Sequence, residues 1–139
     1  MKKYLLDTHI IIWFLLGSKD LSNNIVDEIQ YFQNIYYVSV VSLQEFVMLV
    51  KNNKIKTNKT LADLISDLDK YNINILDLKP QHVRCFENLS NPIEHGKTHD
   101  DPFDRMLIAQ SIAERMTMIS ADTRFPWYKD KNFKLRGNE

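Results

Sequence analysis

Residues 99–110 read HDDPFDRMLIAQ, and this stretch predicts a helix start and an acidic site together. Asp101 is a good N-cap, and Pro102 suits the first helical position because its φ is preset and it has no amide hydrogen to leave unpaired. The residues that follow have helical apolar spacing, so we expect the helix to reach about Arg115. Asp104 lies in its first turn and places a second carboxylate near Asp101.

Short uncharged runs alternate with helical patterns along the rest of the chain. Strands are expected at residues 4–6, 35–41, 73–76 and 117–120, with a short last strand at 133–135. Helices are expected at residues 10–16, after Ser22, after Ser42, across 61–68, and from Pro80 with Val83, Phe86 and Leu89 inward. This alternation predicts an α/β fold with a parallel sheet covered on both faces. No linker or repeat interrupts it, so we expect residues 1–139 to form a single domain.

The composition is that of an ordinary folded domain. Hydrophobic residues make up 44%, and the formal net charge is zero because 18 basic residues balance 18 acidic ones. That balance argues against a wholesale basic nucleic-acid binder. The single cysteine, Cys85, excludes an internal disulfide and suits a reducing compartment. The uninterrupted apolar run at 10–16 is far shorter than the roughly 20 residues that span a bilayer, so we expect a cytoplasmic protein without membrane contact.

Four acidic residues fall where the predicted strands meet helices. Asp7 follows the first strand and Asp122 the fourth. Glu45 is placed in the first turn of the helix after the second strand, and Asp104 in the first turn of the helix before the fourth. Ligands of open parallel sheets bind beyond the carboxyl ends of the strands, so these acids are expected to share one edge. Asp104 reaches that edge only if the loop before its helix returns to it.

Carboxylates gathered in this way would repel one another, and their pKa values would rise unless cations neutralised them. Mg²⁺ and Mn²⁺ prefer oxygen ligands and keep several waters, whereas no cluster of histidine and cysteine offers a zinc site. With only three glycines, the chain also lacks a glycine-rich phosphate loop. The acids therefore predict an Mg²⁺ or Mn²⁺ site, where the ion would activate water and stabilise charge on a phosphate.

Each acid also has a purely structural interpretation. Residues 42–45 read SLQE and fit a capping box, in which Glu45 returns a hydrogen bond to the cap. Asp101 is favoured as an N-cap, Asp104 would suit the helix dipole, and Asp7 or Asp122 could begin a turn. These interpretations weaken jointly, because the acids recur where strands meet helices while the strands are otherwise uncharged.

Histidines and lysines add weaker signals. His99 fits either a proton relay or a support for its loop, and we favour the support. His82 and His95 are expected on the surface, and His9 is expected to help shape the start of the first helix. A solvated patch is the favoured interpretation of four lysines, with phosphate tracking as the alternative: Lys51, Lys54, Lys56 and Lys59.

Four motifs, in this order and spacing, resemble the PIN-domain family, specifically the VapC-like toxins of bacterial toxin–antitoxin modules. They are YLLDTH at 4–9, SVVSLQE at 39–45, HDDPFDR at 99–105 and ISAD at 119–122. The resemblance covers essentially the whole chain, and HxDPFDR followed by LIAQ is its most specific part. Ser120 stands where threonine is commoner in the family, and either residue supplies a hydroxyl group.

The resemblance implies a three-layer α/β/α sandwich around a parallel sheet of about five strands. It also implies Mg²⁺- or Mn²⁺-dependent hydrolysis of RNA, a homodimer, and inhibition by a cognate antitoxin. Asp7, Glu45 and Asp104 match the central acidic triad of the family, and Asp122 matches its usual fourth acid. Asp101 belongs to the same motif and is a further candidate ligand.

Two other functions remain open on the residues alone. A phosphatase of the haloacid-dehalogenase type would use an aspartate that ends the first strand, as Asp7 does. It would normally carry a second aspartate two residues later, where this chain has His9. A PIN-like module that binds RNA or protein without cutting would not need the complete set of acids, which favours the nuclease.

Overall fold

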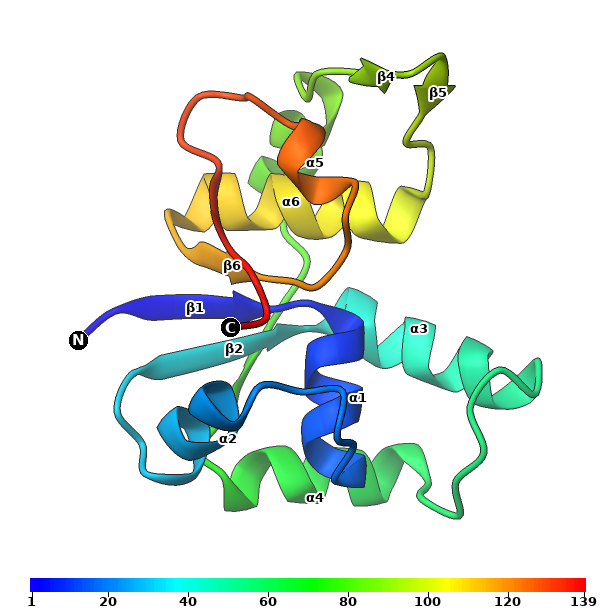
Figure 1. The fold of residues 1–139 in the computed structure, drawn as a ribbon, viewed down its shortest axis with the longest axis vertical. Coiled ribbons are helices and arrows are strands. Elements are labelled where there is room, and N and C mark those ends of the chain that lie inside the picture. The colour runs from blue at the N-terminus through cyan, green and yellow to red at the C-terminus, as the bar shows by residue number, and fades with distance from the viewer.

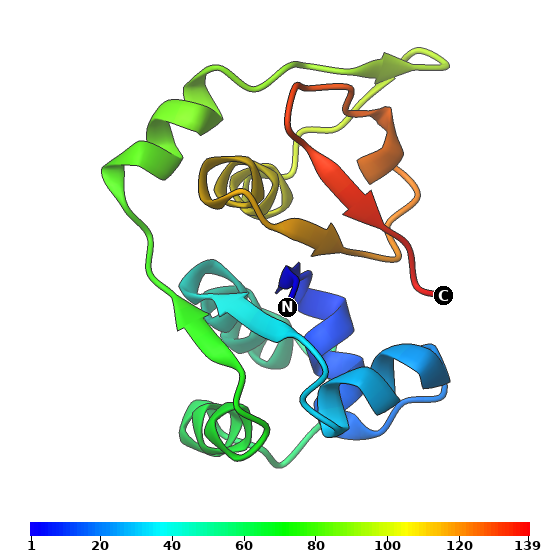
Figure 2. The same ribbon diagram turned by 90° about the vertical axis from the view of Figure 1, so that its left-hand side faces the viewer.

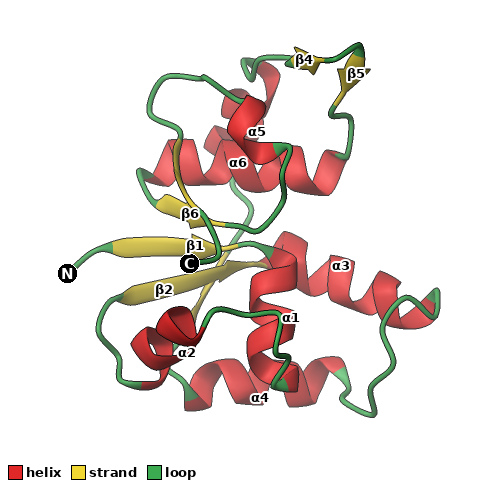
Figure 3. Ribbon diagram, in the orientation of Figure 1, coloured by secondary structure: helices red, strands yellow, loops and turns green.

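The computed structural model describes residues 1–139 and contains a five-stranded parallel sheet with helices on both faces (Figure 1, Figure 3). The order across the sheet is β3-β2-β1-β6-β7, and every neighbouring pair is parallel. Its strands are β1 (Lys3–Leu6), β2 (Ile35–Ser39), β3 (Asn74–Leu76), β6 (Thr117–Ile119) and β7 (Lys134–Arg136). The predicted parallel sheet of about five strands is confirmed. Between β3 and β6 the chain also contains a small antiparallel hairpin, β4 (Ile93–Glu94) and β5 (Lys97–Thr98).

Helices complete a three-layer arrangement. On one side of the sheet lie α5 (Pro80–Glu87) and α6 (Pro102–Glu114), as Figure 1 shows. On the other side lie α1 (Thr8–Leu16), α2 (Asn23–Gln30), α3 (Val40–Lys51) and α4 (Leu61–Lys70). A 3₁₀ turn, η1 (Phe125–Trp127), follows β6. None of these helices has the length and apolar character needed to cross a membrane.

Strand β1 separates two hydrophobic cores. Leu5 belongs to the core that includes Leu107 of α6 and Met118 of β6, whereas Tyr4 and Leu6 belong to the core on the α1 side. Side chains alternate between the faces of a strand, so a strand covered on both sides needs apolar residues at every position. This requirement explains the uninterrupted YLL run that precedes the first acid.

Most of the predicted helix ends are confirmed. Gly17 ends α1 in the left-handed conformation, with φ of 67°, which glycine adopts without a Cβ penalty. Ser22 caps α2, and its hydroxyl accepts a hydrogen bond from the Asn24 N–H at 3.2 Å. Asp101 caps α6 and accepts from the Asp104 N–H at 3.0 Å.

The predicted start of α3 was wrong by three residues. Strand β2 ends at Ser39, whose hydroxyl caps α3 by accepting from the backbone N–H two residues later at 3.0 Å. The valines at 40 and 41 were assigned to the strand because a buried apolar run does not distinguish a strand from a helix start. Ser42 instead accepts a hydrogen bond from the Thr8 hydroxyl at 2.8 Å. The capping box is therefore absent, and Glu45 lies in the second turn of α3.

His82, expected on the surface, is fully buried at 0% exposure. Its Nδ1 accepts from the Lys79 N–H at 3.0 Å, and its Nε2 lies 2.6 Å from a carboxylate oxygen of Glu114 on α6. These partners let an imidazole replace an apolar side chain between α5 and α6. Val83, predicted to point inward, is exposed instead, because the adjacent His82 occupies the buried face of α5. His95 is exposed, as expected.

Candidate metal centre

The carboxyl ends of β1 and β6 meet where the strand order reverses, since β1 leads to β2 on one side and lies beside β6 on the other. Ligands of open α/β sheets bind at such a switch point. Asp7 follows β1, and Ser120 and Asp122 follow β6. The Ser120 hydroxyl donates to Asp7 Oδ2 at 2.7 Å and accepts from the Asp122 N–H at 3.0 Å. Ser120 therefore links the two acids across the sheet.

Asp104 reaches the same edge of the sheet from the first turn of α6. The β4–β5 hairpin and the segment after it lead to the N-terminus of α6 at the carboxyl ends of the strands (Figure 1, Figure 2). A cavity of about 250 Å³ results, and its lining consists of Asp7, His9, Trp13, Glu45, Asp101, Asp104, Ala121, Asp122 and Arg124. The structure thus brings together all the acids singled out in the sequence, and the return of the loop is confirmed.

Glu45 enters the cavity from the second turn of α3. Its Oε1 atom is buried and has no hydrogen-bond partner. A buried carboxylate oxygen without a donor or a cation is costly, so such atoms are rare in folded proteins. Independently of any motif, this unpaired oxygen is a group that a cation in the cavity would satisfy.

The electrostatics of the cavity point the same way. Burial raises the pKa of Asp104 to about 8, and the neighbouring carboxylates add to the effect: Asp7, Asp101, Glu45 and Asp122. Burial raises the pKa of Asp7 to about 6, although the Ser120 hydroxyl and the Thr8 N–H both donate to it. A divalent cation among these groups would favour their ionised forms and remove the penalty.

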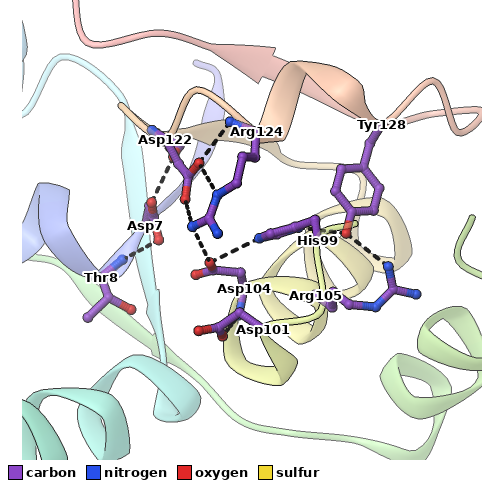
Figure 4. A network of polar contacts seen from close by, with 10 residues as sticks. Asp7, Thr8, His99, Asp101, Asp104, Arg105, Asp122, Arg124 and Tyr128 are labelled. Atoms are coloured by element: carbon purple, nitrogen blue, oxygen red, sulfur yellow. Dashed lines mark hydrogen bonds and ion pairs between the residues drawn. The ribbon is translucent and has the colours of Figure 1, made fainter. Parts of the chain in front are cut away.

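Asp122 differs because it has a cationic partner. Burial would raise its pKa, but hydrogen bonds from Arg124 and the charge of Arg124 outweigh burial, so the pKa lies below its usual value. The Arg124 Nε and Nη2 atoms lie 3.1 and 2.8 Å from the two Asp122 oxygens, and Nη2 lies 3.8 Å from Asp104 Oδ2 (Figure 4). Arg124 was not among the residues predicted for the site. Its place two residues after an acid that follows a strand was the available signal.

His99 connects the acids to a buried hydrogen-bond chain. Its Nε2 lies 3.2 Å from Asp104 Oδ2, and its Nδ1 lies 2.7 Å from the Tyr128 hydroxyl (Figure 4). Arg105 Nη1 donates to that hydroxyl at 2.9 Å and to the Ser90 carbonyl at 3.0 Å. With the hydroxyl accepting from Arg105 and donating to Nδ1, the histidine carries its proton on Nε2 and donates to Asp104. These contacts fit the predicted supporting role.

His99 also lies close to two of the acids. One imidazole nitrogen and one carboxylate oxygen each from Asp104 and Asp122 all lie within 4.8 Å of one another. Asp101 contributes mainly as the cap of α6, as favoured from the sequence, while it also lines the cavity. Because the His99 Nε2–H donates to Asp104, the groups that can hold an ion here are chiefly the carboxylate oxygens.

Replacing Tyr128 by phenylalanine is expected to lower the free energy of unfolding by about 1–2 kcal/mol, because Arg105 and His99 would lose a buried partner. Denaturant titration measures the change. Tyr31→Phe is the matched control, since Tyr31 is 71% exposed. Equal stability of the two variants would contradict a supporting role for the Tyr128 hydroxyl.

Fold and site together define an α/β protein with a carboxylate cluster at the switch point of a parallel sheet. A model of the PIN domain matches residues 4–131, a range that includes every acid of the cavity. The chain therefore belongs to the PIN-domain family. No curated protein matches it at a significant level of sequence similarity.

Solved structures share this fold over nearly the full chain. A chain of VapBC2 from Rickettsia felis, bound to a promoter DNA fragment, is 19% identical with a TM-score of 0.71, covering 99% of both chains. A chain of DNA-bound VapBC from Salmonella typhimurium is 14% identical with a TM-score of 0.62, over 99% of this chain and 98% of that one. A chain of FitAB bound to the IR36 DNA fragment is 18% identical with a TM-score of 0.62, over 97% and 94%. At these identities the similarity is one of fold.

Proposed function

We propose that the chain is a metal-dependent endoribonuclease of the VapC-like kind, which hydrolyses RNA phosphodiester bonds at the acidic cavity. The observation that carries this proposal is the convergence of Asp7, Glu45, Asp104 and Asp122, from four separate segments, on one cavity. The buried, unpaired Glu45 oxygen and the raised pKa values of Asp7 and Asp104 support it, because all three features call for a cation. Membership of the PIN-domain family supports the nuclease over a phosphatase that uses Asp7 as nucleophile.

Mg²⁺ or Mn²⁺ suits this donor set, since both ions prefer carboxylate oxygens. We assign Asp7, Glu45 and Asp104 as the residues that would hold the ion, with Asp122 completing the site and Asp101 as a further candidate. When bound, the ion would lower the pKa of an attacking water and stabilise negative charge that develops on the phosphate.

The chain's own groups orient the reacting parts. Ser120 and the Thr8 N–H hold the Asp7 carboxylate in one orientation, and His99 does the same for Asp104. The Arg124 side chain lines the cavity and remains 45% exposed, so its guanidinium can reach a phosphate that enters. Carboxylates and donors held before substrate arrives need little rearrangement during the reaction.

We also propose a cognate antitoxin protein as partner, a homodimeric state and a cytoplasmic location. The support is the resemblance of the motifs to VapC-like toxins and the fold shared with chains of VapBC and FitAB. Co-expression with the product of a neighbouring small reading frame is expected to suppress RNA cleavage. Undiminished cleavage with every such product would remove the antitoxin from the proposal.

The test of the nuclease uses the purified chain, a single-stranded RNA of mixed sequence and buffer freed of metal. Cleavage is expected to rise at least about 100-fold on addition of Mg²⁺ or Mn²⁺ and to stop with a chelator, because the ion activates the attacking water. Asp7→Asn is the inactive control. Cleavage that is independent of metal, or an unimpaired Asp7→Asn variant, would overturn the assignment.

The same preparation separates the alternatives. Calorimetric titration with Mn²⁺ is expected to show binding that Asp7→Asn weakens. Mn²⁺ binding without any RNA cleavage would favour a module that binds but does not cut. A phosphoaspartate trapped at Asp7 would favour the phosphatase.

A further inference from the structure

Two aromatic side chains line the acidic cavity beside the carboxylates. His9 and Trp13 lie four residues apart on α1 and therefore share one face of the helix. Their ring centroids are 6.1 Å apart, with an edge-on interplanar angle of 61°. His9 is exposed and Trp13 is half-buried, so part of this aromatic surface remains accessible in the cavity.

The hydrophobic core does not account for this surface. Ile10, Ile11 and Phe14 of α1 are buried in the core on the sheet side, and Ile12 is buried against α3 and α4. Trp13 packs only partly against that core and also lines the cavity that holds the carboxylates. The exposed aromatic surface beside the carboxylates is not stabilised by burial within the chain. A ligand with a flat apolar face would cover it, and binding of such a ligand is therefore favoured.

Nucleic acids offer such a face next to a phosphate. The acids and Arg124 can address the phosphate, but no carboxylate provides a stacking surface for a base. Aromatic side chains stack on unpaired bases of single-stranded RNA, whatever the base, because every base has a π-face. His9 and Trp13 line the same cavity as Asp7. A nucleoside adjacent to a phosphate at Asp7 is thus within reach of both rings.

We propose that Trp13, with the His9 ring edge-on beside it, forms a nucleobase-stacking platform, which holds a base of single-stranded RNA beside the scissile phosphate. The platform rests on the proposed nuclease function and adds how the same site holds its substrate. Stacking tolerates any base, so the platform raises affinity for single strands in general. It also disfavours duplex RNA, in which the bases already stack on one another.

The first test measures stacking directly. The chain has two tryptophans, so Trp127→Phe leaves Trp13 as the only indole fluorophore. Asp104→Asn in the same chain prevents cleavage during the titration. A single-stranded oligouridine is expected to quench Trp13 fluorescence, whereas a ribose-phosphate oligomer of equal length without bases is expected to leave it unchanged. Equal quenching by both oligomers, or RNA binding by anisotropy without quenching, would overturn the platform.

The second test uses variants of the otherwise unchanged, active chain. His9→Ala and Trp13→Leu are each expected to raise the KM for single-stranded RNA about tenfold with little change in kcat, because stacking is lost while the acids remain. Trp13→Phe keeps an aromatic face and is the matched control, expected within about threefold of wild type. The affinity for Mn²⁺, measured by calorimetry, is expected to be unchanged in all three variants.

The outcomes separate the platform from the nuclease. Trp13→Leu retains apolar contact with the core. If Trp13→Leu nevertheless fails to fold, His9→Ala provides the test alone, because His9 is exposed and its replacement leaves the core unchanged. Wild-type cleavage together with unchanged KM values in the variants would overturn the platform and leave the nuclease standing. A wild-type chain that neither binds nor cleaves RNA would overturn both.

Discussion

Asp104→Asn is expected to lower kcat for RNA cleavage by more than about 100-fold while the chain keeps its fold. Asparagine retains a side-chain oxygen that accepts from His99, and the backbone N–H at position 104 still donates to Asp101. It lacks the negative charge that would hold a metal ion. Even residues that merely orient metal ligands typically contribute 10–100-fold, so loss of a direct ligand is expected to exceed that range. Steady-state cleavage at saturating RNA and calorimetry with Mn²⁺ measure the two losses separately.

The neighbouring acids of the same motif provide matched controls. Asp100 is exposed, accepts a hydrogen bond from the Thr98 hydroxyl at 2.6 Å and does not line the cavity. Asp100→Asn is therefore expected to leave kcat within about twofold of wild type. Asp101→Asn keeps a good N-cap and is expected to fall between the other two. Similar activity of the Asp100 and Asp104 variants would remove Asp104 from the metal centre.

The stability of the metal-free chain is expected to fall as pH rises from 7 to 9. Burial raises the pKa of Asp104 to about 8, above the ordinary value of 3.8 that applies in the unfolded chain. Between these two values the folded chain binds more protons than the unfolded chain, so the free energy of unfolding decreases with increasing pH. His99, whose pKa burial lowers from 6.5, acts in the opposite direction but only below about pH 6.5. The window from pH 7 to 9 therefore reports mainly on Asp104.

Calorimetric melting in the presence of a chelator measures this dependence. Asp104→Asn is expected to flatten it and to raise the free energy of unfolding at pH 8 by about 1–2 kcal/mol, or roughly 3–8 °C in Tm. Asp100→Asn, the exposed control, is expected to keep the wild-type slope. Mn²⁺ at about 100 times its Kd is expected to stabilise the wild type by about 2.7 kcal/mol. Wild-type stability that rises from pH 7 to 9 would contradict the raised pKa.

Local signals predicted much of the fold. Asp101, Ser22 and Gly17 mark helix ends through interactions with their own neighbours, so their roles could be read from a few residues. The failures also have local causes. A run of β-branched residues continued from β2 into α3, and Ser42 resembled a cap while Ser39 was the cap. His82 was expected on the surface because it is polar, and its half-buried partner Glu114 is 32 residues away.

The candidate site was predicted as a set of residues but not as an arrangement. Asp7, Glu45, Asp104 and Asp122 were recognised because acids interrupt otherwise uncharged junctions of strand and helix. Arg124 and Tyr128 were missed. Their partners become apparent only when η1 lies over the N-terminus of α6, where Tyr128 meets His99 and Arg124 meets Asp104. The aromatic surface of His9 and Trp13 likewise becomes a feature of the site only through the cavity that it lines.

Local sequence was enough to predict most strands and helices and the junctions that carry carboxylates, because these properties depend on neighbours within a few residues. The strand order and the convergence of the acids, in contrast, depend on contacts between segments that are distant in the sequence. The Ser120 hydroxyl and Asp7, 113 residues apart, come within 2.7 Å because β6 pairs with β1. The raised pKa values of Asp7 and Asp104 likewise arise from burial and mutual repulsion, which exist only once the chain has folded.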